Sequence, residues 1–457
     1  MRTHRGSKGK DRLTQSAALL ARAEKLIDHA RKAGADKADA IVVRSRSRSV
    51  SVRNGAVENT NSAESDDFSL RVFVGQRVAS VSAGQGVDEA TLAARAVAMA
   101  KVSPEDPYAC LADESLLARY WGNLDLFDPT EPEAAEMTET AKAMEAAALA
   151  VPSVSGSIGA GVGSGLSGLV LVTSHGFAGA FERSGFSRSV SVIAGSGTKM
   201  ERDYDFDGRV HYRDLDSPEK IGKSAGERVV RRINPCKVPT AANLTVVFDP
   251  RVSRGLIGHL IGAINGASVA RKTTFLKDRM GEEIAIPGLT IIDNPSIPRG
   301  AASRPFDGEG LSTGPLVMVE NGVLKQWYLS SPVARELGLV TNGRASRSGG
   351  GVTPSSTNVV VSPGRVTPRE LIRDVGTGFY VTELIGQGVN TLTGEYSRGA
   401  SGFWIENGEL AFPVSEVTIA ANLRDMYRRM TLADDIDPNF AIAAPTIAVE
   451  GMTLAGD

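Results

Sequence analysis

Residues 253–263 read SRGLIGHLIGA and carry a single histidine, His259, on a stretch with the apolar spacing of a helix. A zinc peptidase helix needs two imidazoles to bind the metal and a carboxylate to polarise the attacking water. This stretch has no second histidine and no acid. A lone histidine among apolar neighbours is more often a packed helix residue than a metal ligand. These residues therefore predict no metal site.

Charged side chains follow this stretch and recur in two later glycine-flanked turns. They are Arg271, Lys272, Asp307, Glu309, Glu395 and Arg398. In one interpretation they form ion pairs that pin the loops of a β-rich domain. In the other they line a groove that holds an extended peptide by its backbone and charges. Both interpretations stay open, and because no nucleophile or ligand set accompanies these residues, we assign no catalytic residue.

Several short blocks occur in a fixed order along the C-terminal half. They read GHLIGAI at 258–264, RKTTFL at 271–276, PFDGEG at 305–310, GQGVN at 386–390, TGEYSRGA at 393–400 and GFWIENG at 402–408. Together they resemble the PmbA/TldE branch of the TldD/PmbA family, over roughly residues 38–450 and most strongly after 240. The TldD branch carries H-E-x-x-x-H on the helix and a later cysteine, and it holds zinc. This chain has Gly258, His259 and Ala263 at those positions, and no cysteine follows Cys236.

The resemblance implies a subunit of a cytoplasmic TldD/TldE zinc metalloprotease, a family formerly labelled modulator of DNA gyrase. Such complexes cleave unfolded or leader peptides. The chain would be the non-catalytic subunit of a heterodimer, without a cofactor of its own, and a TldD-like partner would bring the zinc. His259 and the six charged residues would then contact substrate or partner. A stand-alone peptide-binding or regulatory homodimer without enzymatic activity is the alternative that stays open.

The bulk composition excludes several other classes. Lys plus Arg number 51 and Asp plus Glu number 53, so no net field attracts nucleic acid or an anionic membrane. No apolar run reaches the roughly 18 residues that suggest a membrane span. The basic N-terminus lacks an apolar signal core, and Cys110 and Cys236 lie far apart. We therefore expect a cytoplasmic protein without disulfide bonds.

The elements that must position these residues follow from hydrophobic periodicity. A helix is expected over 12–34, then strands joined by a turn at Asn54-Gly55, then a helix over 88–101. The same order returns with helices over 133–150 and 217–232. Between them we expect strands at 152–160, 168–174, 177–183 and 187–195. This repetition predicts an internal duplication.

The predicted fold class is α+β. We expect a disordered basic tail over 1–12, an N-terminal α+β unit over 13–127 and a second such unit over 128–240. A β-rich C-terminal domain over 241–457 would contain the degenerate metallopeptidase helix, near 250–265.

Two further motifs are interpreted as structural. The pattern G-x-G-x-x-G at 163–168 leads into a strand, whereas a dinucleotide site needs a helix there. The acids Asp203, Asp205 and Asp207 resemble the start of a calcium loop but lack its later glutamate and flanking helices. We interpret this segment as a polar turn.

Overall fold

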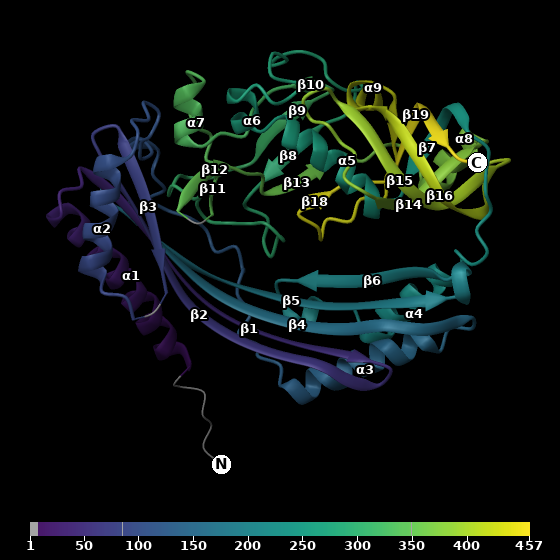
Figure 1. The fold of residues 1–457 in the computed structure, drawn as a ribbon, viewed down its shortest axis with the longest axis horizontal. Helices are drawn as coiled ribbons and strands as arrows, with labels where there is room; N and C mark the ends of the chain where they lie inside the picture. The colour runs from purple at the N-terminus through teal and green to yellow at the C-terminus, as the bar shows by residue number, and fades with distance from the viewer. Residues whose placement is uncertain (1–7, 85, 349) are drawn as a thin grey trace.

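The computed structural model describes residues 8–84, 86–348 and 350–457. It shows a long curved sheet with helices on its outer face and a β-rich C-terminal body over its inner face (Figure 1). Helix α1 begins at Lys8, within the segment expected to be a tail, and residues 1–7 lie outside the described part. No helix in the described ranges is long and apolar enough to cross a membrane.

The curved sheet has six antiparallel strands in the order β3-β2-β1-β4-β5-β6. Their bounds are β1 Lys37–Arg53, β2 Ala56–Val74, β3 Arg77–Ala83, β4 Val154–Thr173, β5 Ala178–Ala194 and β6 Glu201–Arg209. The helices on it are α1 Lys8–Lys32, α2 Glu89–Val102, α3 Ala134–Leu149 and α4 Pro218–Val230. Short 3₁₀ turns occur at Glu114–Leu116, Gly197–Lys199 and Tyr212–Asp214.

The sheet confirms the predicted duplication. Each unit contributes three consecutive strands with a helix before and after them, and β1 and β4 pair antiparallel at the centre. Helices α1 and α2 pack on the first three strands and part of β4, while α3 and α4 cover the other end. The α+β fold class is therefore confirmed, and the two repeats share one sheet.

Buried apolar and small polar side chains alternate along the strands of the curved sheet, and α3 and α4 cover the apolar face. Val50, Val162 and Val190 are buried under α3 and α4. Their strand neighbours, such as Ser49 and Ser189, project from the opposite face, because successive side chains of a strand alternate. That inner face is the one that the C-terminal body covers (Figure 1).

Three expectations for this sheet were wrong. The strands expected at 177–183 and 187–195 are one strand, β5. The strands expected at 152–160 and 168–174 are one strand, β4, whose glycine-rich middle is held by ladders to β1 and β5 on both sides. The acidic segment expected to be a turn is the edge strand β6. Its acids are neutralised by arginines, Asp203 by Arg251 at 2.8 Å among them, so the charges do not prevent sheet formation.

The C-terminal body contains a closed barrel of β7, β14, β15, β16 and β19, with β17 beside β19. The bounds are β7 Ala241–Phe248, β14 Gly378–Ile385, β15 Glu395–Glu406, β16 Glu409–Asn422, β17 Met430–Leu432 and β19 Ile447–Ala455. A second sheet comprises β10 Val323–Leu324, β9 Leu316–Glu320, β8 Ile291–Asn294, β13 Asn358–Val361 and β18 Ile442–Ala443. A hairpin joins β11 Ala345–Ser348 to β12 Gly351–Pro354. The helices are α5 Pro250–Ala263, α6 Gly266–Ala270, α7 Ser331–Glu336, α8 Pro368–Val375 and α9 Leu423–Arg428.

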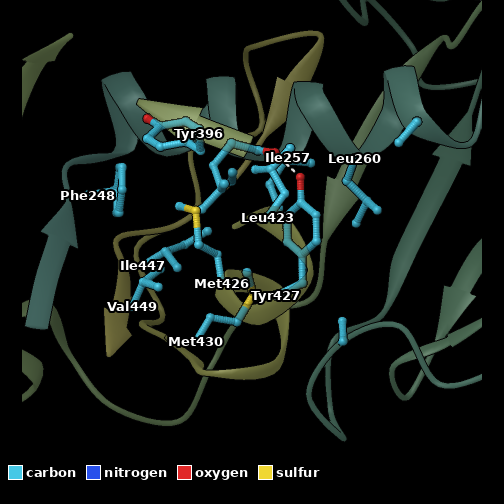
Figure 2. Close-up of a cluster of buried hydrophobic side chains, with 14 of the residues drawn as sticks. Phe248, Ile257, Leu260, Tyr396, Leu423, Met426, Tyr427, Met430, Ile447 and Val449 are labelled. Carbon is cyan, nitrogen blue, oxygen red and sulfur yellow. Dashed lines mark hydrogen bonds between the residues drawn. The ribbon is translucent and has the colours of Figure 1, made fainter. Parts of the chain in front are cut away.

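Helix α5 is the predicted degenerate helix. Asp249 caps its start by accepting a hydrogen bond from the Arg251 N–H, and Pro250 occupies the first turn, where a missing donor costs nothing. Figure 2 shows Ile257 and Leu260 of α5 directed toward the buried side chains of α9. The Tyr427 hydroxyl donates to the Leu256 carbonyl at 3.0 Å, which fixes α5 against α9.

Candidate functional site

The open face of α5 carries almost no side chains. Gly255 and Gly262 are exposed, and a Cβ added at either would meet nothing within 4 Å. His259 lies half-buried on this face, with its ring in edge contact with Tyr396 of β15 at 6.1 Å between centroids. Burial, and then the charge of Arg398, lower the pKa of His259 below its usual value. The imidazole is therefore neutral at pH 7.

The residues of α5 do not fit a catalytic zinc ion. Such a site needs three protein ligands. His259 has a guanidinium as its charged neighbour, and Ala263, one turn further along the helix, is fully buried and has no ligand atom. Across the described residues, no group of three or more His, Cys, Asp or Glu side chains could hold a metal ion.

The predicted site residues fall into two places. Arg398 lies near His259 in the first part of β15, where its Nε donates to the Ile385 carbonyl at 3.3 Å, and Glu395 is exposed on the same strand. Arg271 and Lys272 are exposed just after α6. The Phe275 N–H donates to the Thr391 carbonyl at 3.0 Å, which ties the 271–276 segment to the loop before β15.

Asp307 and Glu309 lie elsewhere, buried where the C-terminal body meets the sheet, and each is only 2% exposed. Asp307 accepts hydrogen bonds from the backbone N–H groups of Glu309, Leu311 and Ala345. Glu309 accepts one from the Ser331 N–H at 2.8 Å, while its other oxygen has no partner among the described residues. Burial, and then the charge of Asp307, raise the pKa of Glu309 to about 7.

A buried ion cluster beside this turn joins the sheet to the C-terminal body. Asp39 of β1 is fully buried and binds Arg71 of β2 at 3.0 Å and Arg347 of β11 at 2.7 Å. Arg347 also donates to the Gly308 carbonyl at 2.6 Å, next to Glu309. Burial acts to raise the pKa of Asp39, but the two guanidiniums outweigh it and bring the pKa down to about 2.

Our sequence analysis missed Asp39, Arg71 and Arg347. The signal lay in the pattern of β1. Ala38, Ala40 and Val42 form its helix-covered face, yet Ile41 and Val43 on the other face are apolar as well. Apolar residues on both faces indicate a strand covered on both sides, so a charge there must find a partner. One of its partners, Arg347, is 308 residues further along the chain, so no local pattern could identify it.

The fold and the degenerate α5 define a class of two-layer proteins built around a metallopeptidase-type helix. The chain matches the PmbA/TldA metallopeptidase domain 1 over residues 38–100, the central domain over 127–233 and the C-terminal domain over 241–456. The chain belongs to the PmbA/TldD family, which confirms the resemblance predicted from the sequence.

Known relatives match over nearly the whole chain. The metalloprotease PmbA of Escherichia coli O157:H7 is 38% identical over 426 residues, with 92% of each chain covered. A PmbA homolog of Haemophilus influenzae is 36% identical over 438 residues, with 94% of each covered. The crystal structure of a putative modulator of DNA gyrase from Bacteroides thetaiotaomicron is 27% identical, with a TM-score of 0.88 and coverage of 95% of this chain and 98% of that one. TldE from Thermococcus kodakarensis shares the fold, with a TM-score of 0.81 at 22% identity and coverage of 95% and 99%.

Proposed function

We propose that this chain is the PmbA/TldE-like, non-catalytic subunit of a two-chain cytoplasmic zinc peptidase. A TldD-like partner would supply the zinc and its ligands. The observation that carries the proposal is helix α5, where Gly258, a neutral His259 beside Arg398, and Ala263 stand at the positions of a metal-binding motif. The similarity to a TldE structure supports the same assignment.

The chain would contribute a surface for an extended peptide. A groove of about 300 Å³ on the inner face of the sheet is lined mainly by small polar residues and glycines, Ser49, Ser51, Asn59, Asn61, Gly161, Gly163, Ser187 and Ser189. Short side chains let a peptide backbone approach closely and impose little sequence preference. Such a surface suits unfolded or leader peptides, which are the substrates we propose.

The test is co-expression with a TldD-like chain that carries H-E-x-x-x-H and a late cysteine. We expect the two chains to elute together in size-exclusion chromatography, and we expect cleavage of an unfolded peptide to require both. A chain that stays homodimeric beside that partner, with cleavage by the partner unaffected, would favour the stand-alone peptide-binding alternative.

The charges near α5 give a prediction for the assembled complex. Arg398→Ala and Glu395→Ala should each slow peptide cleavage by up to about tenfold, or about 1.4 kcal/mol, because a partly exposed charge positions substrate without performing chemistry. Zinc content should stay unchanged. Arg369→Ala is the matched control, since Arg369 is 89% exposed on α8, away from α5.

Each variant must first give the unaltered thermal melting curve and still assemble. If folded, assembled variants at Arg271, Asp307, Glu395 and Arg398 all retain full activity, these residues are structural and our assignment of a substrate surface to them is wrong.

A further inference from the structure

A second cavity, distinct from the groove on the sheet, lies where the inner face meets the C-terminal body. It has a volume of about 370 Å³, which is in the range of small-molecule sites. Its walls are largely apolar and come from both layers. They include Ile41, Leu169, Leu171 and Phe181 from the sheet and Phe306 from the C-terminal body. A wall of this kind accepts an aliphatic or aromatic side chain.

One cation in this cavity, Arg304, forms no ion pair among the described residues, although the charges of Asp307 and Asp293 act on it. Arg304 lines the cavity, its Nε is buried without a hydrogen-bond partner among the described residues, and its guanidinium donates a hydrogen bond to the Ser355 carbonyl at 3.3 Å. Among the described residues, no Asp or Glu oxygen lies within 4.0 Å of a nitrogen of the Arg304 guanidinium. Burial lowers the pKa of Arg304 and outweighs the charges of Asp307 and Asp293, which act to raise it, so the guanidinium is poorly solvated. A ligand anion would relieve that cost.

The neighbouring charges restrict which anion fits. Arg347 also lines the cavity, but it is already ion-paired with Asp39 at 2.6 Å. The oxygens of Asp307 are taken by backbone N–H groups. Asp67 is exposed where it lines the cavity, and its charge repels a doubly charged ligand about twice as strongly as a singly charged one. A single carboxylate suits this setting better than a phosphate, because it brings one negative charge beside Asp67 and Asp307 where a phosphate brings more.

We propose that this cavity binds the C-terminal residue of a peptide, with its free carboxylate on Arg304 and an apolar side chain against Phe306 and Leu169. The same chemistry, an apolar group with one carboxylate, could also come from a free monocarboxylic acid. The proposal rests on the proposed function only in taking a peptide as the source. The cavity lies within one chain, so binding does not require the partner.

The test is isothermal titration calorimetry on the isolated full-length chain with N-acetyl-L-phenylalanine. We expect its C-terminal amide to bind at least tenfold more weakly, because the amide carries no charge. Hexanoate, the probe for a free acid, should bind more weakly than the acetylated residue. In Arg304→Gln, affinity for N-acetyl-L-phenylalanine should fall at least tenfold. In Arg299→Gln it should not change, because Arg299 already pairs with Asp125 and Asp214.

Equal binding of the acid and the amide would overturn the proposal, and that comparison needs no variant to fold. Unchanged affinity in a folded Arg304→Gln protein would overturn the role of Arg304. Hexanoate binding as tightly as N-acetyl-L-phenylalanine would overturn the assignment to peptides. Failure to assemble with a TldD-like chain is a separate result, read by chromatography, and it concerns only the proposed function.

Discussion

Asp39→Ala is expected to lower the free energy of unfolding by about 3–5 kcal/mol, the usual cost of removing one partner from a buried ion cluster. Asp39 is fully buried and is shared by Arg71 and Arg347, so its loss leaves two guanidiniums without a counter-charge. Because Arg347 belongs to β11 and Asp39 to β1, the loss also weakens the contact between the sheet and the C-terminal body. Urea unfolding at pH 7, followed by circular dichroism, measures the change.

The matched control is Glu64→Ala, which removes an acid from β2 that pairs with Arg46 on the solvent-exposed part of the same sheet. Exposed pairs contribute between about 0 and 1 kcal/mol, so this variant should unfold close to the parent. If Asp39→Ala unfolds at the same urea concentration as Glu64→Ala, the cluster does not hold the two layers together.

Glu309 is expected to make the chain less stable as the pH rises. Its pKa in the folded protein is raised from its usual 4.5 to about 7. The contribution of Glu309 to stability is therefore fully present below pH 4.5 and is lost as the pH rises to about 7. In that window the unfolded chain releases the proton first, which favours unfolding. A rise of this size corresponds to at most about 3 kcal/mol. Glu309→Gln cannot ionise, so we expect it to remove this contribution.

The measurement compares urea unfolding at pH 5 and pH 8 for the parent, Glu309→Gln and the control Glu320→Gln, whose glutamate is 52% exposed. Only Glu309→Gln should show a smaller loss of stability at pH 8. Identical pH dependence in all three proteins would mean that Glu309 is ionised in the folded protein throughout this range.

Local sequence patterns predicted the helices and the duplication well. The helix expected near 250–265 is α5, and the Asn54-Gly55 turn joins β1 to β2. The errors arose where long-range pairing overrode local preference. Glycines within β4 and acids within β6 indicate turns when considered locally, but ladders with β1 and β5 and ion pairs with Arg251 and Arg232 hold these segments extended.

The candidate site was predictable only in part. The absence of a second ligand beside His259 can be read from neighbouring residues, because helix spacing is local. The separation of Glu309 from Glu395 cannot be read from neighbouring residues, since it depends on which loops the two layers enclose. Arg304 gave no signal at all, because an arginine whose Nε lacks a partner differs from a fully paired one only in its three-dimensional surroundings.

The zinc content of three purified samples tests the central claim most directly: this chain alone, a TldD-like chain alone, and the two together, each dialysed and measured by mass spectrometry. We expect no stoichiometric zinc in this chain, because α5 offers one histidine where a catalytic site needs three ligands. The assembled pair should hold about one zinc ion, and His259→Ala should leave that content unchanged. One tightly held zinc ion in the isolated chain would contradict the assignment of the metal site to the partner.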